Sequence, residues 1–431
     1  MTNTLDTATD LEPVEDFRER ARVWLKENMP RATSNDMFGG GYGTGTEEEE
    51  LADVQRNRDL QRLLFDGGFA GIAFPKEYGG QGLTIDHHMA FGEELTGYAY
   101  PSRFQVPTMQ PCAAIITEFG TEEQKQLFLP RIFKGETLWM QLLSEPSGGS
   151  DVAGAQTSAV RDGDEWIING SKIWTTGAWW SDWGLALVRT NWEVPKHRGL
   201  SVFVFELHQP GIEIHQIEML NGAKEFCQEF ITDLRVPDSQ RIGQVDDGWT
   251  VGIRWMYHER SFGGRSPYVT RPAGFMRQGR TSGDPMLSLA RRAGKIDDPR
   301  TRELIGEAHT LGAVSGSLSK RIGTLIATGQ ITDQAAAMGK VMSGTMVRNT
   351  SISYEIAGAS AAAWDPDDTE DAALGQTGVG YLQRQVGEIA GGTTEMGRNV
   401  ISERVLLMPR ERTLDKDVPF KDVPKGPPAA R

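Results

Sequence analysis

Residues 143–151 read Leu-Ser-Glu-Pro-Ser-Gly-Gly-Ser-Asp, and they follow the apolar run Leu-Trp-Met-Gln-Leu at 138–142. The apolar run predicts a buried strand, and the small residues after it predict a loop. Such a loop offers backbone N–H groups to an electron-rich ligand, because no bulky side chain blocks close approach. The segment therefore predicts a ligand-binding loop at the end of a strand.

A second motif, Ile-Trp-Thr-Thr-Gly at 173–177, places an aromatic ring and two hydroxyl groups at the end of another expected strand. This combination would suit a flat cofactor with hydrogen-bonding edges. Together the two motifs resemble the flavin-contacting signatures of the acyl-CoA dehydrogenase family. The segments Phe-Pro-Lys-Glu-Tyr-Gly-Gly-Gln-Gly at 74–82 and Phe-Gly-Thr-Glu-Glu-Gln-Lys at 119–125 also resemble N-terminal signatures of that family.

The composition bounds the class of protein. The 431 residues are 38% hydrophobic and 24% charged, which is typical of a globular protein. No apolar run is long enough for a membrane span, and residues 1–16 lack the pattern of a secretory signal. Cys112 and Cys227 give no disulfide framework, and His87-His88 lacks a third ligand at metal spacing. The cysteines therefore predict a cytoplasmic protein, and the histidines predict no metal site. The net charge of −14 argues against nucleic-acid binding.

Hydrophobic periodicity separates three regimes. Phe17, Ala21, Trp24 and Leu25 recur at helical spacing, and they are typical of the segment up to residue 135. From about 137 to 242 the period changes to two, and Asp-Gly at 162–163 and Asn-Gly at 169–170 predict hairpins. Long Ala-rich helical patterns then extend to about residue 409. The glycine-rich stretch at 39–45 is interpreted as a surface insertion.

These regimes predict an α+β fold that matches the acyl-CoA dehydrogenase plan. We expect an N-terminal all-helical domain at 1–136 and a middle antiparallel β-barrel or sandwich at 137–245. A C-terminal four-helix bundle is expected at 246–412, followed by a loose tail at 413–431.

The resemblance implies an activity. Members of the family remove two hydrogens from Cα and Cβ of an acyl-CoA thioester and form a trans-2-enoyl-CoA. A carboxylate takes the α-proton, and N5 of FAD accepts a hydride from Cβ. The resemblance also implies electron transfer to an electron-transferring flavoprotein, and assembly into homodimers, homotetramers or a heteromer. Straight-chain, branched and steroid-side-chain thioesters all remain open as substrates.

The catalytic base is expected at an alternative position. Many members carry this glutamate just before the Gly-Thr of a C-terminal loop, where this chain has Gly391. Members similar to isovaleryl-CoA dehydrogenase carry it on a helix, at the position that Glu259 occupies here. Trp255, Glu259 and Phe262 follow i, i+4, i+7 spacing, which sets one carboxylate on an apolar helix stripe. Glu259 is therefore the predicted base, and Glu395 is the rival carboxylate.

The resemblance also assigns ligand contacts. Trp174 would lie against the isoalloxazine ring, Thr176 would donate a hydrogen bond near N5, and Ser150 would lie near the thioester or the pyrophosphate. Arg260, beside the base, is expected to contact the substrate. The expected cofactor contacts are Leu142, Leu143, Ser144, Trp174, Thr175, Thr176, Gly392, Thr393 and Glu395.

Two departures from the family pattern leave alternatives open. The Arg-x-Gln-Phe-Gly segment that contacts a neighbouring subunit's FAD has no clean match near residues 290–299, and Glu355 stands where the family has Gln. One alternative is a flavin monooxygenase or nitroalkane-type oxidase on the same scaffold. The other is a cofactor-poor subunit of a heteromeric dehydrogenase.

Overall fold

The computed structural model describes residues 11–32, 46–260, 266–270, 272, 285–362, 372–410, 413 and 415–424. The expected insertion at 39–45 lies outside the described residues. The chain divides into two compact units. The first unit comprises Met1–Ile217, Glu225–Met276 and Val418–Arg431, and the second comprises Glu218–Lys224 and Arg277–Asp417. None of the described helices combines the length and the apolarity needed to cross a lipid bilayer.

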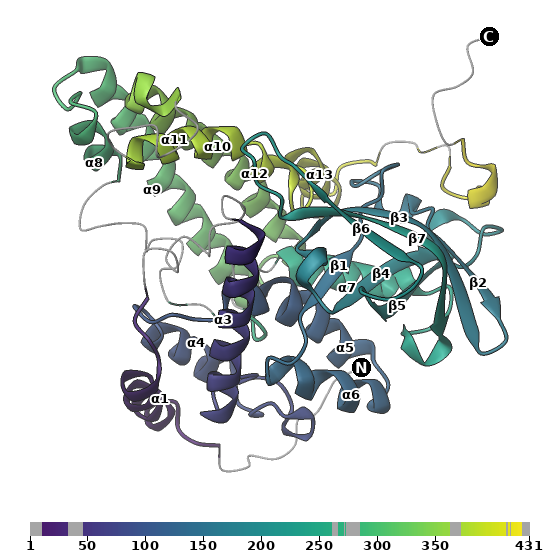
Figure 1. Ribbon diagram of the computed structural model, residues 1–431. Coiled ribbons are helices and arrows are strands. Elements are labelled where there is room, and N and C mark those ends of the chain that lie inside the picture. The colour runs from purple at the N-terminus through teal and green to yellow at the C-terminus, as the bar shows by residue number, and fades with distance from the viewer. Residues whose placement is uncertain are drawn as a thin grey trace, which may run out of the picture. The chain divides into compact units, whose positions relative to one another are not determined.

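Helices form the N-terminal part of the first unit (Figure 1). Their bounds are α1 Val14–Asn28, α3 Glu47–Asp66, η1 Lys76–Tyr78, α4 Ile85–Glu94, η2 Phe104–Ala113, α5 Ala114–Phe119 and α6 Glu122–Phe133. Phe17, Ala21 and Leu25 are fully buried on one face of α1, as their spacing predicts. A capping box between Thr46 and Glu49 begins α3, so its four leading glutamates lie where the helix dipole favours negative charge.

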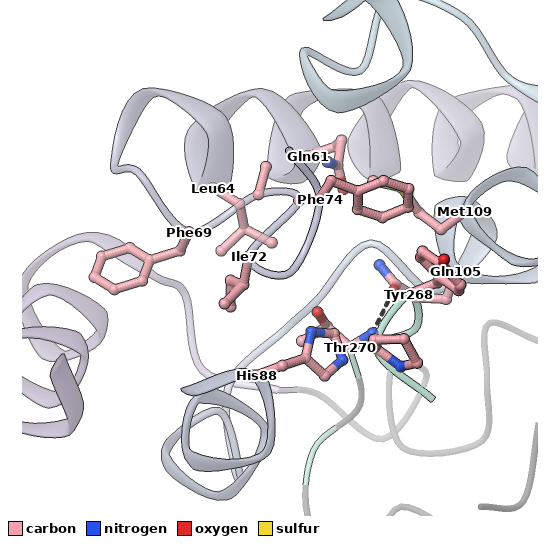
Figure 2. Close-up of a pocket in the computed structure, with 13 residues that line it drawn as sticks. Gln61, Leu64, Phe69, Ile72, Phe74, His88, Gln105, Met109, Tyr268 and Thr270 are labelled. Atoms are coloured by element: carbon pink, nitrogen blue, oxygen red, sulfur yellow. Dashed lines mark hydrogen bonds between the residues drawn. The ribbon is translucent and has the colours of Figure 1, made fainter. Parts of the chain in front are cut away.

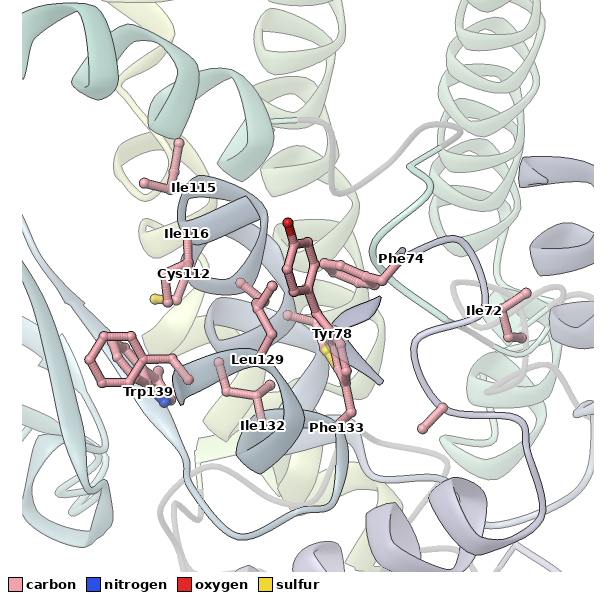
Figure 3. Packing of buried hydrophobic residues seen from close by; sticks show 14 of the residues in the cluster. Ile72, Phe74, Tyr78, Cys112, Ile115, Ile116, Leu129, Ile132, Phe133 and Trp139 are labelled. Carbon is pink, nitrogen blue, oxygen red and sulfur yellow. The ribbon is translucent and has the colours of Figure 1, made fainter. Parts of the chain in front are cut away.

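A continuous apolar core joins these helices to the sheet. Figure 3 shows part of this core, which includes Phe74, Leu129, Phe133 and Trp139. The rings of Phe74 and Phe133 lie 4.7 Å apart between centroids. Trp139 stacks on Trp183 at 5.2 Å, and both belong to strands of the sheet. Because helices and sheet share this core, they form a single unit.

Eight strands form the middle part of the first unit (Figure 1). Their bounds are β1 Trp139–Leu142, β2 Ser158–Asp162, β3 Glu165–Thr176, β4 Trp183–Arg189, β5 Leu200–Glu206, β6 Ile212–Ile217, β7 Phe226–Pro237 and β8 Arg241–Ile242. The strand order is β6-β7-β3-β2-β4-β5-β8, with β1 parallel to β4.

The described sheet is not closed into a barrel. Side chains from strands on either side of β2 instead share one core: Trp166 of β3 packs against Phe203 of β5 with ring centroids 5.4 Å apart. This packing of two sheet halves is that of a sandwich, one of the two forms that the sequence predicts.

The expected hairpin at Asn169-Gly170 is wrong. β3 runs as one strand over Glu165–Thr176, and its register with β7 shifts at Gly170. A Cβ atom on Gly170 would lie 2.6 Å from Cα of Thr157, so this glycine permits a close approach within a bulge. The hairpin expected at Asp162-Gly163 is present, because β2 and β3 pair in antiparallel fashion on either side of it.

Helices make up most of the second unit (Figure 1). Their bounds are α8 Pro285–Arg292, α9 Pro299–Ala327, α10 Ala337–Ala357, α11 Ala372–Gln383, α12 Val386–Ile389 and α13 Thr394–Val400. The Asp298 side chain caps α9 by accepting a hydrogen bond of 2.7 Å from the backbone N–H of Thr301. Leu304 of α9 and Ile352 and Ile356 of α10 are buried against each other.

Two segments from the C-terminal part of the sequence belong to the first unit. α7, Gly248–Arg260, packs against α5, η2 and β5. Residues 418–424 also belong there, within the range expected to be a loose tail. The domain boundaries drawn from the sequence stay a prediction.

Phe420 anchors the C-terminal segment to the sheet. Its side chain is buried, and the guanidinium of Arg189 lies 3.8 Å from its ring centroid. The backbone N–H of Phe420 donates to the carbonyl of Val194 at 2.9 Å, and the rings of Trp192 and Phe420 lie 5.3 Å apart between centroids. Arg189 in turn donates to the carbonyl of Ala153 at 2.6 Å. The segment therefore covers an arginine that supports the loop after residue 151.

We expect Phe420→Ala to lower the free energy of unfolding by about 3–5 kcal/mol, because it removes a buried ring. Urea denaturation followed by tryptophan fluorescence measures this loss. Leu220→Ala, at a largely exposed position, serves as the control and should change stability by less than about 0.5 kcal/mol. Equal stability of the two variants would show that Phe420 does not anchor the segment.

Candidate active site

The two motifs that define the expected flavin site lie side by side in the first unit. The backbone N–H of Ile173, in β3, donates to the carbonyl of Ser144 at 3.0 Å. The loop at 143–151 therefore lies against the end of β3, where Trp174 and Thr176 are found. The structure thus brings together two motifs that are about thirty residues apart in the sequence.

A buried ion pair fixes the loop. Glu145 accepts hydrogen bonds from the backbone N–H groups of Gln156 and Thr157, at 2.6 and 3.0 Å. Nζ of the fully buried Lys172 lies 2.8 Å from Oε1 of Glu145. Burial opposes ionisation of Glu145, but the ammonium of Lys172 and the backbone donors hold the pKa of that carboxyl below its usual value. The ion pair therefore ties the loop to β3.

A bulge in β3 presents Trp174 on the surface. The register between β3 and β7 shifts between Ile173 and Thr175, and Trp174 has a φ of 66°. Its indole is 55% exposed, whereas the Thr175 side chain points into the sheet. Thr176, the last residue of β3, is half-buried. In a regular strand the side chain of residue 174 would point inward, like that of Lys172. The bulge instead turns this large aromatic side chain outward.

The remaining expected contacts in this unit differ in what they can offer a ligand. The Leu142 side chain is fully buried in the core of the sheet, so only its backbone can face a ligand. Leu143 and Ser144 are half-buried, and Ser150 is exposed. Asp151, next to Ser150, forms an ion pair with Lys196 at 2.9 Å.

Helix α7 places Glu259 against strand β1. The indole N–H of the buried Trp255 donates to Oε1 of Gln141 at 2.7 Å, and Nε2 of Gln141 donates to Oε1 of Glu259 at 3.3 Å. Gln141 is the second-last residue of β1, the strand that leads into the expected flavin-binding loop. The half-buried Glu259 therefore lies next to the strand that leads into this loop. The Arg260 side chain and Phe262 lie outside what the structure describes.

Glu118 of α5 binds two side chains of α7 beside Glu259. This carboxylate accepts two bonds from Arg254, at 2.7 and 2.8 Å, and one from Nε2 of His258 at 2.8 Å. Burial alone would raise the pKa of Glu118, but these bonds outweigh it and lower the pKa to about 2. The backbone carbonyl of His258 also accepts a hydrogen bond from Nε2 of the buried Gln110. His258 thus holds α7 in place.

Gln141, Glu118 and Gln110 are site residues that the sequence reasoning missed. Gln141 carried a signal, because it is the only polar residue in the apolar run 138–142. A polar side chain within a buried strand requires a hydrogen-bonding partner, and such partners gather at functional sites.

Gly392, Thr393 and Glu395 belong to the second unit. Gly391 and Gly392 have φ values of 70° and 91°, which favour glycine. Thr393 caps α13 by accepting a hydrogen bond from the backbone N–H of Met396 at 3.1 Å. The Glu395 carboxylate is exposed in the first turn of α13, where a bond from its own backbone N–H lowers its pKa. An exposed carboxylate with a lowered pKa is a weak proton acceptor, whereas a catalytic base needs a desolvated carboxylate.

The unusual Glu355 has a counter-charge within the second unit. Its Oε1 lies 3.3 Å from Nε of Arg300. Lys340 supports the glycine loop from α10, donating to the carbonyls of Gly387 and Ala390 at 2.9 and 2.7 Å. Arg300 therefore offsets the negative charge that Glu355 would present to an anionic ligand.

A small cavity in the first unit is a different feature. Figure 2 shows Phe74, His88, Met109 and Tyr268 around it. Its volume is about 10 Å³. Ligand pockets are typically about 300–1,000 Å³ in volume, so this cavity is too small for an acyl chain.

Comparisons with known proteins show the family to which this chain belongs. The family model "Acyl-CoA dehydrogenase, N-terminal domain" matches residues 14–136, and "Acyl-CoA dehydrogenase, middle domain" matches residues 141–233. The acyl-CoA dehydrogenase IpdE1 of Mycobacterium tuberculosis is 32% identical over 408 residues, which cover 93% of this chain and 99% of that protein. The chain belongs to the acyl-CoA dehydrogenase family.

Solved structures of the family have the same fold. The Tcur3481-Tcur3483 steroid ACAD matches with a TM-score of 0.72 and 26% identity over 93% of this chain and 99% of that one. The ChsE4-ChsE5 complex from Mycobacterium tuberculosis matches with a TM-score of 0.67 and 24% identity over 94% of this chain and 100% of that one. The second likeness shows the fold alone.

We expect Gln141→Leu to slow flavin reduction by acyl-CoA about ten- to a hundredfold, because Glu259 loses the N–H that orients it. The indole N–H of Trp255 would also lose its partner, which should lower stability by about 1–3 kcal/mol. Anaerobic stopped-flow absorbance and urea denaturation measure the two effects. Gln244→Leu, at an exposed position, is the control. An unchanged reduction rate in Gln141→Leu would exclude an orienting role.

Proposed function

We propose that this protein is an FAD-dependent acyl-CoA dehydrogenase that forms a trans-2-enoyl-CoA, with Glu259 as the base. The observation that carries the proposal is the link from Glu259 through Gln141 to the strand that leads into the loop at 143–151. A carboxylate held beside such a loop is suited to remove a proton from a substrate bound there.

The residues present fit a flavin. The indole of Trp174 is large, flat and 55% exposed, and threonines follow it. A planar ring system packs well against such a surface. Leu142, Leu143, Ser144, Trp174, Thr175 and Thr176 would hold the flavin, and Gly392, Thr393 and Glu395 would hold the adenosine diphosphate half. FAD, when bound, supplies the acceptor for the hydride that leaves Cβ.

The chain's own residues would divide the remaining work. Glu259 takes the proton from Cα of the thioester, and Gln141 holds its carboxylate in place. Glu118 pairs with the guanidinium of Arg254, so that this cation does not stabilise the ionised base and weaken it. Ser150 and Arg260 would contact the CoA thioester.

The proposal includes the partners of the reaction. Electrons would pass to an electron-transferring flavoprotein, and the protein would act as a homodimer or homotetramer, or together with a second type of subunit. One structural relative is described as a steroid ACAD, so a steroid-side-chain thioester belongs among the substrates to be tested.

Anaerobic titration of the purified protein with straight-chain, branched and steroid acyl-CoAs tests this function. We expect a yellow protein whose flavin absorbance is bleached by at least one of these thioesters. A colourless protein that does not take up FAD would favour the cofactor-poor subunit. Peroxide formation in air without an acyl-CoA would favour an oxidase.

A further inference from the structure

A buried polar cluster lies inside the sheet behind the bulge at Trp174. Its members are Lys172 and Thr175 of β3, Glu229 of β7 and Glu145 of the loop after β1, and all four side chains are buried. Lys172 and Glu229 are opposite each other in the β3–β7 register, so they share one face of the sheet.

Glu229 receives no hydrogen bond from the ammonium of Lys172. Lys172 donates to Oε1 of Glu145 at 2.8 Å, to the carbonyl of Leu187 at 2.6 Å and to that of Leu143 at 3.4 Å. An ammonium has three N–H donors, so these bonds use all of them. Oε2 of Glu229 accepts the hydroxyl of Thr175 at 2.9 Å, and Oε1 has no partner among the described residues.

This environment favours a neutral carboxyl group. Glu229 is fully buried, and an ionised carboxylate that has only neutral donors is costly to bury. Burial raises the pKa of Glu229 to about 8, although the Thr175 hydroxyl, the backbone N–H of Glu229 and the charge of Lys172 act in the opposite direction. The group is therefore protonated near pH 7, and it releases its proton to solvent as the pH rises through about 8.

Other titratable groups face Glu229 from the elements packed against it. Lys172 is paired with Glu145, although burial lowers the pKa of Lys172 below its usual value. The guanidinium of Arg189 on β4 lies near this pair, and burial lowers its pKa to about 10. The thiol of Cys227 on β7 has its pKa raised to about 12, chiefly by burial. On β6 the residue opposite Glu229 is the apolar Ile214. Glu229 is the carboxyl group of this cluster that has an oxygen without a partner among the described residues, so we expect it to change charge near pH 8.

We infer that Glu229 is a positioning residue for the flavin site, an inference that rests on the proposed function. Its neutral carboxyl fixes the Thr175 hydroxyl and so holds the bulge between Trp174 and Thr176. When it ionises, a negative charge appears behind the bulge. A negative charge opposes the addition of electrons to a nearby flavin, so the bound flavin becomes harder to reduce.

The midpoint potential of the bound flavin, measured by spectroelectrochemistry from pH 6 to pH 10, tests this inference. We expect the wild-type potential to show an added inflection near pH 8. At pH values above this inflection, the ratio of the affinity for reduced flavin to the affinity for oxidised flavin should be lower by about tenfold. Glu229→Gln keeps a neutral partner for Thr175 and should lack the inflection. Glu213→Gln removes an exposed carboxylate from β6 of the same sheet and should retain it.

A wild-type profile without the inflection overturns the inference, and it does so even if Glu229→Gln does not fold. An inflection that persists in Glu229→Gln also overturns it. If the protein binds FAD and is reduced by an acyl-CoA but shows no inflection, only this inference fails. If the protein binds no FAD, the proposed function fails as well.

Discussion

Glu259→Gln is expected to abolish the bleaching of the flavin by acyl-CoA while the protein keeps its yellow colour. The amide can still accept the hydrogen bond from Gln141, so the local structure should be retained. It cannot accept the α-proton, and the loss of a positioned base typically costs about 10²–10⁴-fold in rate. Anaerobic stopped-flow absorbance under single-turnover conditions measures this rate.

Glu395→Gln is the matched control for this experiment. Its carboxylate is exposed, with a lowered pKa, and we assign it to cofactor binding. We expect this variant to reduce its flavin at nearly the wild-type rate once it is saturated with FAD. The reverse pattern, a fast Glu259→Gln and an inactive Glu395→Gln, would move the base to the second unit.

Lys172→Met is expected to cause a large loss of stability. The change leaves the buried Glu145 without its cation, and breaking one side of a buried ion pair typically costs about 3–5 kcal/mol. FAD affinity should fall as well, because Glu145 also binds the backbone of residues 156 and 157 beside the loop. Urea denaturation and titration of the apoprotein with FAD measure the two effects.

The pH dependence of the same variant provides a second check. Because the folded-state pKa of Glu145 is lowered, the ion pair contributes fully above the unfolded pKa of about 4.3, and this contribution is lost as the pH falls. Lys172→Met should therefore lose less stability than the wild type in this acidic window.

Arg235→Gln, which breaks an exposed pair with Asp162, should cost less than about 1 kcal/mol. Similar costs for both variants would contradict a structural role for the buried pair.

Local patterns predicted much of the fold. The stripe on α1 and the turn at Asp162-Gly163 depend on neighbouring residues, and the structure has both. The pair Asn169-Gly170 has the same turn preference, but the close approach of Thr157 produces a bulge there. The contact between Thr157 and Gly170 forms only in the folded structure, so the local turn preference of the sequence does not predict it.

The same reason explains which site residues escaped prediction. In a regular strand Lys172 and Thr175 would point to opposite faces, but the bulge after Ile173 turns both of them inward. From the sequence, Glu229 would be expected on the surface of a strand. The sequence does not show that Lys172, its partner in the neighbouring strand, already donates all of its hydrogen bonds to other groups. The motifs at 143–151 and 173–177 were easier to predict, since each is continuous in sequence.

Exchange of the α-proton of a bound acyl-CoA in deuterated buffer, followed by mass spectrometry, tests the central claim most directly. The exchange reports proton removal itself and does not require hydride transfer. We expect the wild type and Glu395→Gln to exchange this proton and Glu259→Gln not to exchange it. Exchange at the wild-type rate in Glu259→Gln would contradict the assignment of the base.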